Sequence, residues 1–515
     1  MDLLIPAVAV LILAAWLVRP DLPGLRGTAL VRALLLGGLS AFVTLYFVMP
    51  PLTPVVIALL FGLNLAASQV VGLLLERKTG FARGLAVGAL ILVGVGLLAL
   101  VAVPLGAPDL AGLLPVNESS ETATVISTGH IRQVSAETAL WRADKPVGRI
   151  GYKAGTEEVH VQQLDGSIAW LCPLDFTDPY KALVYGDEGT GGYVLVPAED
   201  PYAEARFVSA DLRYTPNAVF GHDLFRSIYF ESPGVIIREP VFQVGTGPAW
   251  VAHLTSPSVL GVTGDVPVGI AVVDAVTGTV IVYPTDGVPD WVQRPYDEAL
   301  VEDYLGWWGA YRGGWVNSWL GQRDVLHPTG GLTTSAGEDG RVRVEAAGTD
   351  VYLVVGADGR QYWFSPLTSA GRDFSMVGYM LVDARDGSAV FHRHDGIYND
   401  LGAAQNVQQD PEVSKVMGLR VVQPIMYVIG GEEVWVVPVI APSGEMKAVG
   451  LVRARGGTTF VSSTLEGALA RIGEVAPAPG AGDPVAVIAE LRGLVARLGE
   501  RIDALESALN QTPGS

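Results

Sequence analysis

Residues 247–256 read GPAWVAHLTS, and residues 359–369 read GRQYWFSPLTS. In both stretches a glycine precedes a tryptophan by three or four residues, and a Leu-Thr-Ser triplet begins four residues after the tryptophan. Because side chains alternate along a strand, Trp250 and Trp363 share a strand face with the leucine that follows each of them. The pattern predicts a β-strand with one buried face, which starts after a glycine turn and occurs more than once.

The same spacing occurs at two further places. Trp170 and Trp435 each follow a glycine by four residues and precede an aliphatic residue by four. Residues 106–474 are therefore predicted to form a β-rich α+β region of repeated units, in which Trp170, Trp250, Trp363 and Trp435 are core residues. A sugar-binding platform built on these tryptophans is the functional alternative.

A second shared motif follows two of these strands. It reads Val-Asp-Ala-x-x-Gly, with Asp274 and Gly278 in the first copy and Asp383 and Gly387 in the second. An aspartate can accept hydrogen bonds from nearby backbone amides, and glycine readily adopts a positive φ. The motif therefore predicts a hairpin turn, in which these four residues have a structural role.

The strand that ends in VDAVTG at residues 273–278 resembles the closing hairpin of PepSY-type domains. Residues 134–148, which precede the Trp170 strand, resemble the opening helix of the same domains. Residues 464–470 are similar to a short helix of some bacterial membrane families. PepSY-type domains are small extracytoplasmic α+β modules, often attached to membrane proteins and involved in peptidase inhibition or binding. The resemblance implies a binding or inhibitory module and no catalytic residue.

The N-terminal part of the chain contains four apolar runs, at Leu3–Val18, Ala29–Val48, Val55–Leu75 and Ala82–Val103. An α-helix needs roughly 20 residues to cross about 30 Å of hydrocarbon, and the first run is marginal by this measure. Its start is acidic and its end offers no small-residue cleavage site, so we expect a retained span rather than a signal peptide. Residues 1–105 are thus predicted to form a four-span domain in the lipid bilayer.

The linkers between these runs predict the orientation of the chain. Basic residues lie in the first and third linkers or at their borders, whereas the second linker has no charge: they are Arg19, Arg26, Arg77, Lys78 and Arg83. Because basic loops stay in the cytoplasm, both termini and the large domain are expected outside it. The middle of each run lacks Asp, Glu, Lys and His, which favours an anchor or assembly module over a pump.

Composition narrows the classes of function. The chain has 515 residues with a net charge of −19, which disfavours nucleic-acid binding. Its one cysteine, Cys172, excludes an intramolecular disulfide and a cysteine-rich zinc site. The sequence contains no nucleophile elbow, phosphate-binding loop or zinc-protease signature. It therefore predicts no catalytic residue, no cofactor and no metal site.

Two helices are predicted outside the apolar runs. Tyr296–Leu320 reads as one helix, with acidic residues in its N-terminal half and aromatic residues at helical spacing. Packing in the core is favoured for it, with contact to the membrane surface as the alternative. After a Pro/Ala/Gly linker at 475–483, residues 484–510 are predicted to form a coiled coil. Its core positions are Ile488, Leu491, Val495, Leu498, Ile502, Leu505 and Leu509, which favour a parallel dimer, with a trimer or a single helix docked on its own chain as the alternatives.

Together these features predict a membrane-anchored structural or binding protein of the cell envelope, which self-associates through its C-terminal helix. Its candidate ligands are peptides and envelope polymers. The alternative is a membrane-tethered enzyme that acts on such ligands through a site without a known motif. A cleft with convergent carboxylates of shifted pKa would favour the enzyme.

Overall fold

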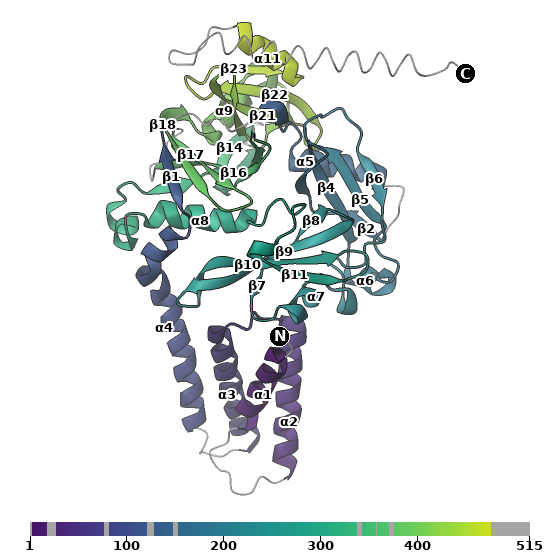
Figure 1. Cartoon of the computed structure of the whole chain (residues 1–515), viewed down its shortest axis with the longest axis vertical. Helices are drawn as coiled ribbons and strands as arrows, with labels where there is room; N and C mark the ends of the chain where they lie inside the picture. The colour runs from purple at the N-terminus through teal and green to yellow at the C-terminus, as the bar shows by residue number, and fades with distance from the viewer. Residues whose placement is uncertain are drawn as a thin grey trace, which may run out of the picture.

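The computed structural model describes residues 3–17, 27–76, 82–120, 128–147, 153–336, 342–356, 358–369 and 375–474. A bundle of apolar helices lies at one end, and a larger β-rich region lies beyond it (Figure 1). The linker 475–483 and the predicted coiled coil 484–510 lie outside the described residues.

The bundle contains three helices that are long and apolar enough to cross a membrane, over Leu30–Val48, Pro54–Val71 and Leu85–Gly112. They belong to α2 (Gly27–Phe42) with its π-helical extension η1 (Val43–Val48), to α3 (Pro54–Glu76) and to α4 (Ala82–Gly112). The first apolar run forms α1 (Leu4–Leu17), whose 14 residues span only about 21 Å. The prediction of apolar helices of membrane-spanning length is thus confirmed for three of the four runs.

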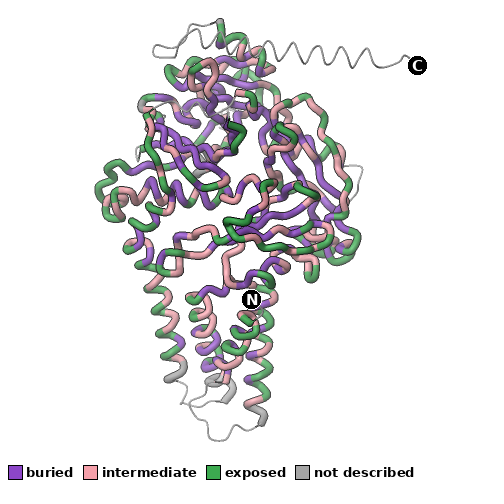
Figure 2. Tube along the Cα trace, viewed as in Figure 1, coloured by how far each residue is buried: buried purple, intermediate pink, exposed green. Residues whose placement is uncertain are grey.

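The helices of the bundle expose apolar side chains. Figure 2 shows that buried residues gather in the β region, whereas exposed and intermediate residues dominate the bundle. Leu35, Leu90 and Leu100 are each more than 60% exposed, at 67%, 69% and 72%. Apolar surface of this kind requires an apolar environment, which lipid chains provide.

The N-terminus and the turn between η1 and α3 lie at the end of the bundle that faces the β region (Figure 1). The Leu52 N–H donates to the Pro233 carbonyl over 2.7 Å. The Arg226 Nε donates to the Tyr46 carbonyl over 3.1 Å, and the same guanidinium stacks on the Tyr46 ring. The uncharged second linker is therefore on the side of the β region, whereas α2 begins and α3 ends at the far end of the bundle.

Four sheets of the β region share one strand order, and we number them units 1 to 4. In each, a long strand carrying a repeat tryptophan pairs with two short strands along one edge and with the next strand of the chain along the other. The strands are β2 (Ala154–Thr156), β3 (His160–Leu164), β4 (Ser167–Phe176), β5 (Gly192–Pro197) and β6 (Arg206–Ser209) in unit 1; β7 (Ile236–Ile237), β8 (Val241–Val244), β9 (Pro248–Val259), β10 (Thr263–Asp274) and β11 (Val280–Pro284) in unit 2; β12 (Leu326–Pro328), β15 (Tyr352–Val355), β16 (Gln361–Ser369), β17 (Ser375–Asp383) and β18 (Ala389–Tyr398) in unit 3; and β19 (Arg420–Val421), β20 (Ile425–Ile429), β21 (Glu432–Ile440), β22 (Met446–Arg453) and β23 (Thr459–Ser462) in unit 4.

A helix precedes the sheet in every unit. These helices are α5 (Ala136–Val147), α7 (Leu224–Glu231), α8 (Glu298–Tyr311) and α9 (Asp400–Gln409). Unit 3 also contains β1 (Val116–Ser119), parallel to β18, and an inserted hairpin of β13 (Gly330–Ala336) and β14 (Val342–Thr349). The short helices α6 (Pro179–Tyr185), α10 (Pro411–Ser414) and α11 (Leu465–Glu474) complete the region.

The three largest hydrophobic cores of the β region lie between units. One core joins Trp250 of unit 2 to Leu171 of unit 1. A second joins Trp170 of unit 1 to Trp363 of unit 3, and a third joins Phe364 of unit 3 to Trp435 of unit 4. The units therefore pack in the spatial order 2, 1, 3, 4, and each depends on its neighbours for burial of its apolar face.

Each repeat tryptophan is buried, with exposed fractions of 5% for Trp170, 1% for Trp250, 2% for Trp363 and 0% for Trp435. In units 1, 3 and 4 its indole N–H donates over 2.8–2.9 Å to a backbone carbonyl two residues before the helix of the unit begins. The indole N–H of Trp250 has no partner among the described residues. The tryptophan thus joins the central strand to the start of the helix in three units.

The predicted turns are present after the second long strand of units 2 and 3. Asp274 Oδ1 accepts the Val276 and Thr277 N–H groups, and Gly278 follows with a φ of +75°. Asp383 and Gly387 repeat this geometry, with a φ of +73° at the glycine. A Cβ added at Gly387 would lie 2.5 Å from the Tyr296 ring, so the turn packs tightly against the residue that accepts the tryptophan N–H of unit 3.

Tyr296–Leu320 is not one helix, so that prediction is wrong. Helix α8 ends at Tyr311, because Gly314 takes a φ of +86° that a right-handed helix does not allow. Helix α8 itself packs in the core, as predicted, with Leu300 and Tyr304 buried. Beyond the break, Trp319 is 66% exposed.

Candidate functional site

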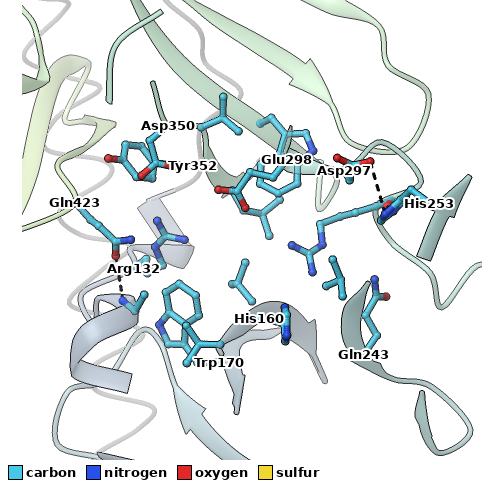
Figure 3. Close-up of a pocket in the computed structure, with 18 residues that line it drawn as sticks. Arg132, His160, Trp170, Gln243, His253, Asp297, Glu298, Asp350, Tyr352 and Gln423 are labelled. Atoms are coloured by element: carbon cyan, nitrogen blue, oxygen red, sulfur yellow. Dashed lines mark hydrogen bonds and ion pairs between the residues drawn. The ribbon is translucent and has the colours of Figure 1, made fainter. Parts of the chain in front are cut away.

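A polar cavity of about 200 Å³ lies where the units meet. Strands β3, β8 and β15 bring His160, Val241 and Tyr352 to it, and these three residues have equivalent positions, each paired with the residue after its unit's tryptophan. Unit 4 contributes Gln423, which precedes β20. Figure 3 shows these side chains around one space, in which charged groups from distant parts of the sequence face each other. The repeat itself therefore positions the lining of the cavity.

Two buried arginines line this cavity from equivalent positions in units 1 and 3. Arg132 and Arg294 lie two residues before the carbonyl that accepts the tryptophan N–H of their unit. The Arg132 Cζ is 5.2 Å from the centre of the Trp170 ring, and the Arg294 Cζ is 5.6 Å from that of Trp363. Each arginine is only 5% exposed. Aromatic stacking thus holds both guanidinium planes at the cavity wall.

These two guanidinium groups have no anionic partner in contact. Among the described residues, neither forms an ion pair, and Arg294 Nη2 is buried without any hydrogen-bond partner. Burial lowers the pKa of Arg294 to about 10, which still leaves it charged at neutral pH. A buried charge without a partner is unfavourable by several kcal/mol, so a water or a ligand must supply the missing acceptors.

Three carboxyl groups form the acidic part of the site. Oxygens of Glu298, Glu302 and Asp350 lie within 4.8 Å of one another. Glu298 and Asp350 also share a side-chain hydrogen bond, which requires a proton on one of them. Glu298 and Asp350 line the cavity, and the Glu298 side chain is exposed to it.

The surroundings of these carboxyl groups favour their protonated forms. Burial, followed by the charge of Asp350, raises the pKa of Glu302 to about 7. Burial also raises the pKa of Glu298 and of Asp350, and the negative charges of Asp350 and Glu302 add to the effect at Glu298. The site therefore contains carboxyl groups that change protonation near neutral pH.

A further wall of the cavity is held by hydrogen bonds and an ion pair. Asp297 caps α8, because its Oδ1 accepts the Leu300 N–H over 2.8 Å, while its Oδ2 lies 3.3 Å from Arg238 Nε. His253 Nε2 lies 2.7 Å from the Arg294 carbonyl oxygen, and burial lowers the pKa of this histidine. The neutral ring can donate its Nε2–H to that carbonyl. These contacts fix the backbone that carries Arg294 and Glu298.

Gln243 adds an unpaired amide to the site. Its side chain is 1% exposed, and neither its oxygen nor its nitrogen has a partner among the described residues. The residue lines the cavity from β8, as Figure 3 shows. Buried amides in proteins are almost always hydrogen-bonded, so this group also calls for a water or a ligand.

A second cavity of about 590 Å³ adjoins the first and shares Asp350, Tyr352 and Gln423 with it. The inserted β13–β14 hairpin lines one side of it through Leu332, Thr333 and Val342, and the start of α5 lines another through Glu137. The two cavities are therefore neighbours that share part of their walls.

The predicted structural residues only partly coincide with this site. Trp170 and Trp363 line the cavity, whereas Trp250 and Trp435 lie in the cores beside it. Asp274, Gly278, Asp383 and Gly387 lie in turns and do not line it. The predicted oligomerisation residues, from Ile488 to Leu509, lie outside the described part of the chain.

The sequence analysis missed the charged residues of the site. It used Glu298 and Glu302 only as signs of a helix N-terminus, although their spacing of four residues puts both on one helix face. The three carboxyl groups could hold a divalent cation through oxygen ligands. The positive charges of Arg132 and Arg294 beside them oppose such a cation.

No family, no curated protein and no solved structure matches the chain.

Proposed function

We propose that the protein is a membrane-anchored binding protein of the cell envelope, which holds a small polar ligand between its β units. The observation that carries this proposal is a polar cavity whose wall contains buried hydrogen-bonding groups without partners. They include Arg294 Nη2 and the Gln243 amide. Binding pockets combine a preformed cavity with a few convergent polar groups in this way.

The membrane part of the proposal includes four spans with both termini and the β region outside the cytoplasm. The N-terminus and the uncharged second linker lie on the side of the β region, which supports an even number of crossings (Figure 1). The basic residues of the first and third linkers favour the cytoplasm for the opposite side. Helix α1 is short, and α2 and α3 pack against it within the bundle.

This orientation predicts the labelling of single cysteines. With Cys172 replaced by alanine, Ser120→Cys should react in intact cells with a thiol reagent that cannot cross the membrane, because Ser120 is exposed beside the β region. Thr79→Cys, in the third linker, should react only after lysis. The reverse pattern would place the β region in the cytoplasm and would contradict the proposed location.

Two further parts of the proposal rest on the sequence. We propose self-association through residues 484–510, with a dimer favoured over a trimer, because their heptads need a second helix to cover them. We also propose that the units are PepSY-like binding modules. The order of one helix followed by an antiparallel sheet, present in all four units, supports this relationship.

A membrane-tethered enzyme is the second candidate function. The hydrogen-bonded pair of Glu298 and Asp350 favours it, since carboxyl groups with shifted pKa values often act as acids or bases. The volume of about 200 Å³ excludes a polymer chain from the inner cavity. If the protein is an enzyme, a molecule bound there should be converted to product, and Glu298→Gln should stop the conversion.

Ligand capture tests the proposed binding function. The full chain, purified in detergent and incubated with a small-molecule extract of its host cells, should retain a compound that native mass spectrometry detects. Val241→Phe should lose this compound, because the larger side chain fills the cavity from β8. Val282→Phe, on the exposed surface of β11, is the matched control and should retain it. Failure of the wild-type chain to retain any compound, or equal retention by Val241→Phe, would contradict a ligand site in this cavity.

A further inference from the structure

The cavity holds opposite charges apart. Arg294 interacts electrostatically with Glu298, and Arg132 with Asp350. Within the described part of the chain, however, neither pair comes close enough to form an ion pair, and all four residues line the same cavity. Figure 3 shows Glu298 and Asp350 on one side of the space and Arg132 on the other.

Such an arrangement is unfavourable while the space between the charges holds only solvent. Oppositely charged side chains in a protein interior gain most when they touch and share hydrogen bonds. Here the cation–π contacts with Trp170 and Trp363 keep the two guanidinium groups at one wall of the cavity. The hydrogen bond between Glu298 and Asp350 keeps the carboxyl groups at the other wall. The structure therefore preserves a gap between two charged walls.

We propose that this gap binds a zwitterion of amino-acid size, with its carboxylate on Arg132 and Arg294 and its ammonium group on Glu298 and Asp350. This inference rests on the proposed binding function and specifies the chemical class of the ligand. A guanidinium group suits a carboxylate because it can donate two parallel hydrogen bonds. The free Gln243 amide supplies one more donor and one more acceptor.

A ligand with one charge fits the site less well. A simple anion would satisfy the arginines but would leave the Glu298 and Asp350 pair without a cation. A simple cation would satisfy the acids but would leave both guanidinium groups unpaired. Binding of a zwitterion should also release a proton, because the ammonium group of the ligand replaces the proton that Glu298 and Asp350 share.

Calorimetry on the full chain in detergent tests this proposal. The probes are the standard amino acids, with acetate and methylamine as the two half-ligands. At least one amino acid should bind at a ratio of one per chain and more tightly than either half-ligand. Repeating the titration in buffers with different heats of ionisation should show release of protons on binding.

Three variants connect the binding to the proposed groups. Arg294→Met should lower the affinity for the amino acid by about 10- to 100-fold, because a charged hydrogen-bonding partner is lost. Glu298→Gln should weaken it to a similar extent and abolish proton release. Glu204→Gln is the matched control and should bind like the wild type, since Glu204 is exposed and does not line the cavity.

The outcomes separate this inference from the proposed function. Capture from the extract of a neutral compound, or of one with a single charge, would leave the binding function in place and overturn the zwitterion. Absence of binding by every standard amino acid would also overturn it, as would equal affinity in the Glu298→Gln variant. Loss of binding in Arg294→Met supports the proposal only if its melting temperature shows that the variant is folded.

Discussion

Replacing Trp435 by alanine should lower the free energy of unfolding by about 3–5 kcal/mol. This side chain is completely buried, and its ring centre lies 6.0 Å from that of Phe364 in unit 3. Its indole N–H also donates to the Tyr398 carbonyl over 2.9 Å. Truncation would therefore open a cavity between units 3 and 4 and leave a buried carbonyl without its donor.

Denaturant unfolding of the full chain in detergent, followed by near-ultraviolet circular dichroism, measures this loss. Trp319→Ala is the control, because that side chain is 66% exposed, and its unfolding midpoint should stay close to that of the wild type. Equal midpoints for Trp435→Ala and the wild type would mean that the tryptophan does not belong to the core.

A comparison with unit 2 isolates the hydrogen bond. Trp435→Phe and Trp250→Phe make the same change in buried positions, but only Trp435 donates to a backbone carbonyl. We therefore expect Trp435→Phe to be the more destabilising of the two, by about 1 kcal/mol.

The strand units were predictable from the sequence because their signals are local. A glycine before Trp170, Trp363 or Trp435 marks a turn, and alternation marks the buried face of the strand that follows. The tyrosines whose rings pack against the turn glycines of units 2, 3 and 4, namely Tyr214, Tyr296 and Tyr398, were not recognised as part of the repeat. The tyrosine precedes the tryptophan by 36 residues in unit 2 and by 37 in unit 4, but by 67 in unit 3, where the β13–β14 hairpin is inserted, so no single period marks it.

The cavity could not be predicted in the same way. Arg132, Gln243, Glu298, Asp350 and Gln423 come from all four units, and the packing order 2, 1, 3, 4 decides which of them meet. No sequence period encodes that order. The nearest signal was an arginine in units 1 and 3 that lies two residues before the residue whose carbonyl accepts the tryptophan N–H. This shared position becomes visible only once the units are aligned in space.

The break after α8 illustrates the limit of periodicity. The aromatic spacing of Tyr296–Leu320 continues without interruption through Gly313 and Gly314. The backbone of Gly314 nevertheless turns into a conformation that only glycine adopts at low cost, so the helix ends before it. A local conformational preference therefore prevailed over a pattern of side chains.

Replacing Glu298 by glutamine should stabilise the protein at pH 8 and have little effect at pH 5. Glutamate in the unfolded chain ionises near pH 4.5, whereas burial and the charges of Asp350 and Glu302 raise the pKa of Glu298 in the fold, against the weaker opposing effect of Arg294. Between these two values the folded chain binds more protons than the unfolded chain, so the free energy of unfolding falls as the pH rises. Each unit of pKa shift corresponds to about 1.4 kcal/mol for a group sealed from water, but Glu298 is exposed and solvent screens its charge, so the expected gain at pH 8 is reduced to the order of 1–3 kcal/mol.

Denaturant unfolding of the full chain at a series of pH values measures this difference. Asp386→Asn is the control of opposite sign, since hydrogen bonds from Ser388 and Arg360 outweigh burial and lower the pKa of Asp386. Asp386→Asn should lower the free energy of unfolding at neutral pH, and this loss should become smaller as the pH falls through the lowered pKa. A Glu298→Gln variant that is less stable than the wild type at pH 8 would show that the carboxylate stabilises the fold.

The same variant decides what Glu298 does in the molecule. Replacing a residue that only supports the structure should lower stability. Replacing a binding residue can raise stability, because evolution retains such a residue for function even where it destabilises the fold. Glu298 sits in a cluster of acids, exposed to a cavity, with Arg294 near but not in contact. If Glu298→Gln gains stability and loses the amino acid, unfolding cannot explain the lost binding. The Glu298 carboxylate would then serve to bind the ligand, because an ammonium group in contact with it compensates for the cost of keeping this charge in the cavity.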